Sequence, residues 1–335
     1  MTGRGMTIKW LFLLGAAALL AALIYNLADA LRGGPAERPH VIVMVKSTAT
    51  GMEFWGVLKD GVLEAAKEFD VEVEIVGPER ETDVDQQIGL VEKALADKPD
   101  AIVLAATDFN RLAPYADRIK EAGIPLITVD SAVNSTAPRS YIATDNVEAG
   151  SKVGRKLAEL SGGGRSKIAI ISYVRDTASQ IEREQGVRAV LKADERFEIL
   201  DTYYSGGDET KAYEITKSLI QQHPDLTGIV GLNEPSTVGA GRAIRDLEAV
   251  GRVTLVGFDS SVDEVRLLEE GVMKATVVQR PFNMGYLAVK TAVEVLRGEK
   301  VPARVDTGSV VVTKDNIYEE EHQKLLFPFI GMNGD

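Results

Sequence analysis

Short apolar runs rich in Val and Ile alternate with longer segments of helical period along most of this chain. The runs carry little polar alternation, as expected for parallel strands buried on both faces of a sheet. The predicted strands are Val41–Lys46, Val71–Val76, Ala101–Ala105, Leu126–Val129, Lys167–Ser172, Ile199–Tyr204, Gly228–Gly231, Thr254–Gly257 and Ala275–Val278. Their alternation with helices predicts βαβ units, and therefore an α/β fold built on parallel sheets.

Two details refine this pattern. Leu63, Ala66 and Phe69 recur at three-residue spacing, which predicts the apolar stripe of a helix that packs on a sheet. Around Ser140–Asn146 the rhythm changes, with a short strand and turn-forming residues before a new helix begins near Val147. We interpret this stretch as the passage between two α/β lobes.

Several predicted strands end in a hydrogen-bonding side chain. The apolar runs Val253–Asp259 and Ile124–Asp130 end in carboxylates, and Gly228–Asn233 ends in an amide. Open α/β sheets bind ligands at the carboxyl ends of their strands. Polar groups gathered there predict a pocket for a small hydroxylated molecule.

Composition narrows the classes of function. A chain of 335 residues with 45% hydrophobic content is long enough for two domains, each with its own core. A net charge of -12, with no concentrated Lys/Arg surface, argues against a nucleic-acid partner. The absence of cysteine excludes disulfides, thiolate metal sites, cysteine nucleophiles and a lipidated cysteine.

Residues 1–35 have the character of a signal or anchor segment followed by a linker. The stretch 10–27 is almost wholly apolar, with Arg4 and Lys9 before it, as export signals require. Ala28–Ala30 fits a small-x-small cleavage site, whereas the apolar length approaches that of one transmembrane helix. Two alternatives follow: an anchor through residues 10–28, or a cleaved signal that leaves a secreted or periplasmic protein. Both place the chain from His40 onward outside the cytoplasm.

A series of short motifs then occurs in a fixed order. They are Lys46–Thr48, Glu53–Trp55, Lys59–Gly61, Ile124–Asp130, Ala143–Asn146, Arg183–Gly186, Gly257–Asp259 and Val278–Gln279. In this combination, over about residues 40–316, the chain resembles the type I periplasmic sugar-binding proteins, the ribose-binding-like solute-binding components of ABC transport.

The resemblance implies a fold of two doubly wound parallel-sheet lobes joined by a three-segment hinge. The crossings would fall near Thr144–Asn146, Gln279–Pro281 and Asp306–Gly308. The N-terminal lobe would comprise residues 40–144 and 280–306, and the C-terminal lobe residues 146–279 and 307–316. Residues 317–335 would form a C-terminal tail that packs back on a lobe or contacts a partner.

The resemblance also implies which side chains hold the ligand. Phe54 and Trp55 would clamp the apolar C–H faces of a sugar ring, while polar side chains bind its hydroxyls. The expected ligand-binding residues are Ser47, Thr48, Phe54, Trp55, Asp130, Arg183, Asn233, Asp259 and Gln279. Plainer interpretations stay open, since Asp259 could cap the next helix and the aromatic pair could pack within its own lobe.

Two positions depart from the ribose-binding pattern. Ser131 stands where an arginine is expected, and Gly207 stands where an aromatic residue would close the pocket. Loss of a guanidinium group and an aromatic wall leaves a roomier pocket, which puts ribose itself in doubt. A larger or differently oriented monosaccharide or polyol is therefore the expected ligand.

Catalysis, cofactors and metal ions are not expected. The sequence lacks a phosphate loop, a His-Glu-x-x-His motif and a nucleophile elbow, and His40, His223 and His322 are scattered. A remote alternative is an α/β oxidoreductase or hydrolase acting at Asp130 or Asp259. A repressor with the same effector fold would need a helix-turn-helix where the N-terminal apolar segment lies.

The resemblance implies an ABC sugar permease as partner for a monomeric binding protein. A membrane histidine kinase or chemoreceptor is the alternative, because ligand-sensing proteins of this kind use the same closure around ligand.

Overall fold

The computed structural model describes Leu20, residues 38–49 and residues 52–326. The chain divides into two compact units, Met1–Arg38 and Pro39–Asp335, and the fold below is that of the second. The expected signal or anchor segment lies almost wholly outside the described residues. Within the described ranges, no helix combines the length and the apolar character needed to span a bilayer.

The first part of the Pro39–Asp335 unit and a later segment, residues 281–306, form a six-stranded sheet and its helices, here called the N-lobe. All its pairings are parallel, in the order β11-β5-β4-β3-β1-β2. Its elements are β1 (His40–Met44), α2 (Glu53–Phe69), β2 (Glu72–Val76), α3 (Val84–Asp97), β3 (Ala101–Leu104), α4 (Ala113–Glu121), β4 (Leu126–Val129), β5 (Ser140–Ala143), α10 (Pro281–Leu296) and β11 (Arg304–Asp306).

The remaining elements form the C-lobe, whose six-stranded sheet has the order β12-β10-β9-β8-β6-β7. Only the edge strand β12 is antiparallel to its neighbour among the pairings described. Its elements are α5 (Asn146–Leu160), β6 (Ser166–Ser172), α6 (Ala178–Leu191), β7 (Phe197–Tyr204), α7 (Glu209–Gln222), β8 (Leu226–Gly231), α8 (Glu234–Asp246), β9 (Thr254–Phe258), α9 (Val262–Glu269), β10 (Met273–Val278), β12 (Val310–Thr313) and α11 (Glu320–Leu326).

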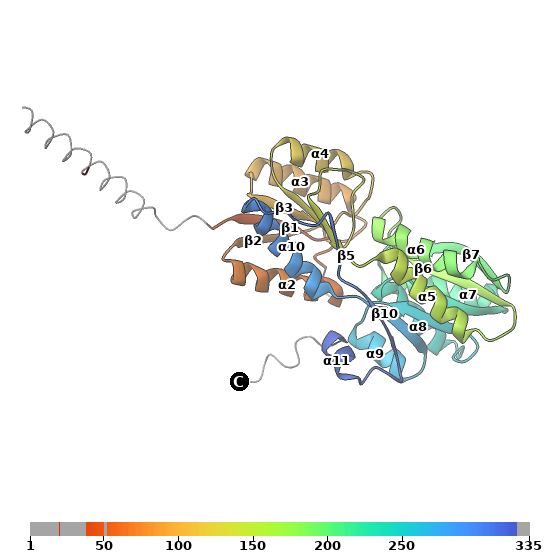
Figure 1. Cartoon of the computed structure of the whole chain (residues 1–335). Coiled ribbons are helices and arrows are strands. Elements are labelled where there is room, and N and C mark those ends of the chain that lie inside the picture. The colour runs from red at the N-terminus through yellow and green to blue at the C-terminus, as the bar shows by residue number, and fades with distance from the viewer. Residues whose placement is uncertain (1–19, 21–37, 50–51, 327–335) are drawn as a thin grey trace, which may run out of the picture. The chain divides into compact units, whose positions relative to one another are not determined.

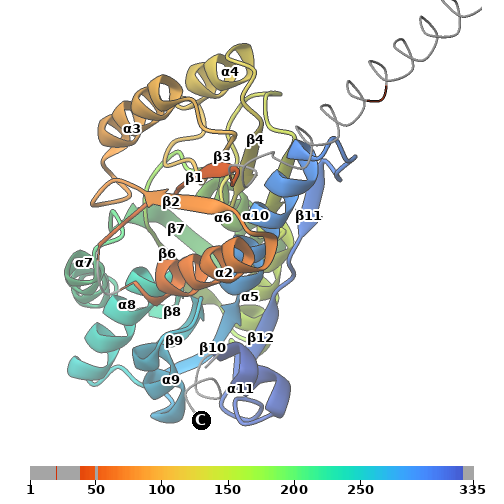
Figure 2. The same cartoon turned by 90° about the vertical axis from the view of Figure 1, so that its left-hand side faces the viewer.

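Helices cover both faces of each sheet. In the N-lobe, α2 and α10 lie side by side on one face (Figure 1; Figure 2), and α3 and α4 pack on the other. The buried stripe of α2 is Trp55, Leu58, Val62 and Ala65, whereas Leu63 is 52% exposed. Of the expected stripe, Ala66 is buried and Phe69 packs against the same core, so only Leu63 was placed wrongly. Three-residue steps drift away from a helix face of 3.6-residue period, which leaves Leu63 off the buried side.

The chain crosses between the sheets after β5, after β10 and after β11. These crossings coincide with the expected hinge segments, and they confirm the two-lobed fold (Figure 1). The tail continues from β12 into α11, where Ile317 and Leu326 are buried in the C-lobe core. Residues 327–335 lie outside the described residues.

Candidate ligand-binding site between the lobes

A pocket with a cavity volume of about 30 Å³ lies between the lobes, at the carboxyl ends of their strands. The lining side chains therefore nearly fill the space between the lobes in this arrangement. Both lobes and the crossing after β10 contribute to it. The lining residues are Lys46, Met52, Phe54, Trp55, Glu81, Asp130, Tyr173, Arg183, Asn233, Glu234, Pro235, Asp259 and Gln279.

Most of the expected ligand-binding residues meet in this pocket: Phe54, Trp55, Asp130, Arg183, Asn233, Asp259 and Gln279. Ser47 and Thr48 do not line it. The Ser47 hydroxyl donates to the Glu79 carbonyl at 2.8 Å, and the Thr48 hydroxyl donates to the Pro78 carbonyl at 3.1 Å. Both therefore fasten the loop after β2, on which Glu81 reaches the pocket.

Asp130 and Asp259 occupy equivalent places in the two lobes. Each directly follows the strand third from the edge of its sheet, β4 or β9. Each has left-handed backbone geometry, with φ of 59° and 78° respectively. Aspartate is among the few non-glycine residues that tolerate this region. The same sharp turn thus delivers a buried carboxylate to the pocket from both sides.

In the N-lobe, the carboxylate of Asp130 is paired with a lysine. Lys46 Nζ lies 2.9 Å from Asp130 Oδ2, and the lysine is 2% exposed. The same nitrogen lies over the rings of Trp55 and Tyr173, 5.6 and 5.5 Å from their centres. Burial works against the charge of Lys46, but the carboxylates of Asp130 and Glu81 outweigh it and raise the pKa of Lys46. The two carboxylates therefore favour the charged form of the ammonium group.

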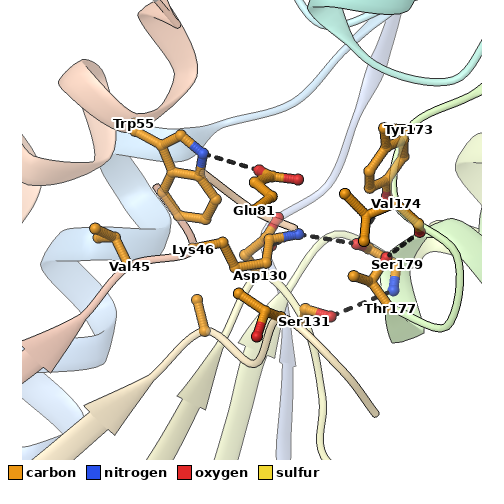
Figure 3. A network of polar contacts seen from close by, with 12 residues as sticks. Val45, Lys46, Trp55, Glu81, Asp130, Ser131, Tyr173, Val174, Thr177 and Ser179 are labelled. Atoms are coloured by element: carbon orange, nitrogen blue, oxygen red, sulfur yellow. Dashed lines mark hydrogen bonds and ion pairs between the residues drawn. The ribbon is translucent and has the colours of Figure 1, made fainter. Parts of the chain in front are cut away.

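Glu81 completes this half of the site (Figure 3). Trp55 Nε1 donates to Glu81 Oε1 at 3.0 Å, which fixes the edge of the indole ring. Burial raises the pKa of Glu81, although the charge of Lys46 works in the opposite direction. The second oxygen, Oε2, is buried without a partner among the described residues.

In the C-lobe, Arg183 is held rigidly. Its Nε donates to Asn146 Oδ1 at 2.9 Å, its Nη1 donates to the Leu232 carbonyl at 2.8 Å, and its guanidinium lies 3.8 Å from the centre of the Phe258 ring. Nη1 also lies 3.9 Å from Asp259 Oδ2. The geometry presents a fixed cation beside a fixed carboxylate.

The partners of Asp259 complete the arrangement. Gln279 Nε2 donates to one of its oxygens at 2.5 Å, and the amide of Glu234 donates to the other at 3.2 Å. Burial raises the pKa of Asp259, although Arg183 opposes the shift. Asn233 Oδ1 accepts from the Ser236 amide at 3.1 Å, so this residue both caps α8 and lines the pocket.

Several lining residues were missed from the sequence: Lys46, Met52, Glu81, Tyr173, Glu234 and Pro235. Lys46 stands at the start of one of the recognised motifs, and Glu234 directly follows Asn233, so their positions were available as signals. Glu81 lies in a loop with no periodicity, and no local pattern marks it. Among the described residues, no cluster of His, Asp or Glu is arranged to hold a metal ion.

Comparison with known proteins places this architecture in a family. The model of the periplasmic binding protein domain matches residues 41–300. The ribose import binding protein of Haemophilus influenzae is 27% identical over 297 residues, which cover 89% of this chain and 98% of that protein. The D-ribose/D-allose-binding protein of Pseudomonas aeruginosa is 26% identical over 86% of this chain and 91% of that protein.

Solved structures of similar proteins lead to the same family. An ABC transporter solute-binding protein from Agrobacterium vitis with bound D-fucose is 34% identical, with a TM-score of 0.83, covering 86% of this chain and all 100% of that one. A carbohydrate transporter solute-binding protein from Agrobacterium radiobacter, in complex with D-arabinose, is 31% identical, with a TM-score of 0.83 and coverage of 87% and 100%. Since the family pattern, the paired sheets and the interlobe pocket coincide, the chain belongs to the periplasmic binding proteins of the two-lobed type I fold.

Proposed function

We propose that this protein is the extracytoplasmic solute-binding component of an ABC importer, and that it encloses a monosaccharide or related polyol between its lobes. The observation that carries the proposal is the buried pocket to which both lobes contribute an aspartate at a left-handed strand end, beside an aromatic pair. Aromatic faces suit the C–H surface of a sugar, and fixed donors and acceptors suit its hydroxyls. The relatives named after ribose and allose, and those bound to D-fucose and D-arabinose, support the same class of ligand.

The charges of the pocket favour a neutral ligand. Its cations are Lys46 and Arg183, and its carboxyl groups are Glu81, Asp130, Glu234 and Asp259. Both cations are already engaged, with Asp130 and Asp259 respectively. A sugar phosphate or uronic acid would find no free cation among these lining residues, so neutral sugars and polyols should bind best.

The position of the pocket between the lobes would couple ligand binding to closure of the lobes. Phe54, Trp55 and Asp130 belong to the N-lobe, whereas Arg183 and Asp259 belong to the C-lobe. A ligand can contact both groups only when the lobes meet, so it binds the closed form more tightly and shifts the population toward it. A permease that recognises the closed arrangement would then receive loaded protein. The relatives are named for import, which favours this role over partnership with a sensor kinase.

The family locates this chain outside the cytoplasm, where a permease partner would meet it. Retention by an uncleaved N-terminal segment and release after cleavage are both compatible with that role. We further propose that the protein acts as a monomer, since one chain supplies both walls of the pocket.

Binding can be tested by titration with D-ribose, D-allose, D-fucose, D-arabinose and D-tagatose. Trp55 is the only tryptophan among the described residues, so a ligand that stacks on it should alter its fluorescence. A ligand at a hundredfold excess over its Kd should stabilise the protein by about 2.7 kcal/mol. Small-angle scattering should show compaction. If nucleotides or amino acids raise the melting temperature and no carbohydrate does, the proposed ligand class is wrong.

A further inference from the structure

Helix α2, which carries Phe54 and Trp55, receives a capping acceptor from the opposite lobe. Its N-cap residue, Met52, makes no side-chain cap hydrogen bond. The first amides of a helix have no partner within the helix and need external acceptors. The amide of Glu53 donates to Glu234 Oε1 at 3.4 Å, and Glu234 is a buried residue at the start of α8 in the C-lobe.

Helix α6, which carries Arg183, shows the converse arrangement. Its N-cap residue, Thr177, also makes no side-chain cap hydrogen bond. The amide of Ser179 donates to the hydroxyl of Ser131 in the N-lobe at 3.5 Å (Figure 3). Lys46 Nζ donates to the Ser179 hydroxyl at 3.4 Å, and both serines are fully buried.

Two neighbouring helices offer a contrast. The amide ends of α8 and α9 are capped from within the C-lobe, by Asn233 and Ser261 respectively. Helix α9 gains one further bond across the lobes, from its Val262 amide to Glu53 Oε1 at 3.2 Å. The capping acceptors of α2 and α6 therefore come from the other lobe, whereas α8 and α9 each keep a side-chain cap from their own lobe.

We propose that Glu234 and Ser131 act as reciprocal caps that hold the lobes together and fix α2 and α6 in their ligand-binding positions. Opening the lobes would remove one acceptor from each helix and leave its amide to water. A single hydrogen bond of this kind makes a modest net contribution, so the closed form stays readily reversible. The inference rests on the proposed function, in which closure serves binding, but the caps themselves require no sugar.

The test uses the distance between the lobes in the full, ligand-free chain. Because the sequence has no cysteine, Lys93→Cys on α3 and Glu214→Cys on α7 would provide two specific spin-label sites. Their side chains are 64% and 62% exposed. Pulsed electron paramagnetic resonance should resolve a short and a long distance. Ser131→Ala and Glu234→Ala should each lower the ratio of short to long about two- to threefold, the low end for one hydrogen bond, because both contacts are long at 3.5 and 3.4 Å.

Two controls separate capping from general damage. Glu234→Gln keeps an acceptor oxygen facing the Glu53 amide and should keep the wild-type ratio. Ser205→Ala removes a buried hydroxyl whose contact with Ser236, at 3.1 Å, lies within the C-lobe, and it should also keep that ratio. If Glu234→Ala does not fold, Ser131→Ala, the smaller change, carries the test by itself.

Either of two results would overturn the inference: a wild-type protein with no short component, or Ser131→Ala and Glu234→Ala variants that retain it. Failure of all sugars to bind, with distances that still respond to the caps, would contradict the proposed ligand class and leave the caps standing. Sugar binding with unresponsive distances would contradict the caps alone.

Discussion

Replacement of Lys46 by methionine should destabilise the fold strongly, although methionine is only one atom shorter than lysine. Lys46 and Asp130 have side chains that are each 3% exposed, and their charged atoms are 2.9 Å apart. Removing one partner of a buried pair leaves the other charge uncompensated and costs about 3–5 kcal/mol. The double variant Lys46→Met, Asp130→Asn removes both charges, so it should recover most of that loss.

Urea unfolding followed by circular dichroism gives the free energy of unfolding for the wild type, both single variants and the double variant. The four values form a double-mutant cycle, whose coupling term measures the pair. Arg118→Met is the control, because Arg118 pairs with Glu92 at 3.1 Å on the surface, with both side chains about half exposed. Exposed pairs contribute little, so this loss should be much smaller.

A single variant no less stable than the Arg118→Met control would refute the reasoning. So would a double variant whose loss equals the sum of the two single losses, because additivity means that the charges do not interact.

Further predictions concern binding, pH and packing. Arg183→Ala and Asp259→Asn, which keeps a residue that tolerates the left-handed backbone, should each weaken the affinity for the cognate sugar at least tenfold by calorimetry. A charge-assisted hydrogen bond contributes ~1.5–3 kcal/mol, and unchanged affinity in both variants would place the ligand elsewhere. Burial first, and then the charge of Asp259, raise the pKa of Glu234 from 4.5 to about 8. The native state therefore binds the Glu234 proton more tightly than the unfolded state, so the free energy of unfolding should fall as pH rises from 4.5 to 8. The Glu234→Gln variant has no such proton, so its urea midpoint should depend less on pH over this range. Gly186→Ala would drive a methyl group into a backbone carbonyl of α5 and should lower both stability and affinity, whereas Gly163→Ala, with open space around it, should change neither.

The sequence predicted the fold because its signals are local. Buried parallel strands are continuous apolar runs, and their polar ends, such as Asp130 and Asn233, mark the ligand edge of each sheet. Individual site residues were harder to predict than the fold. The motif Lys46–Thr48 was recognised, yet the pocket receives Lys46, while Ser47 and Thr48 bond to the neighbouring loop. A buried lysine is improbable until its counter-ion is known, and that partner comes from a distant strand end.

Contacts across the lobes had no sequence signal at all. Glu234 caps a helix that begins 181 residues earlier in the chain. No periodicity or capping motif connects the two positions, since capping patterns describe residues a few places apart. The position of Ser131 was noticed only as the loss of an arginine, and its buried hydroxyl became interpretable once α6 was found beside it.

The left-handed backbone of Asp130 and Asp259 limits which residues can replace them, and therefore how the ligand selectivity of this fold can change. Most side chains would cost about 1–2 kcal/mol in that conformation, whereas Asp, Asn and Gly adopt it readily. Asp130 and Asp259 can therefore be replaced without backbone strain only by asparagine, which removes the charge, or by glycine, which removes the side chain. Glu81 has ordinary backbone geometry and can accept other polar side chains, whereas Lys46 must stay because it neutralises buried Asp130. Redesign toward a new sugar should accordingly keep the two aspartates and Lys46 and vary Glu81.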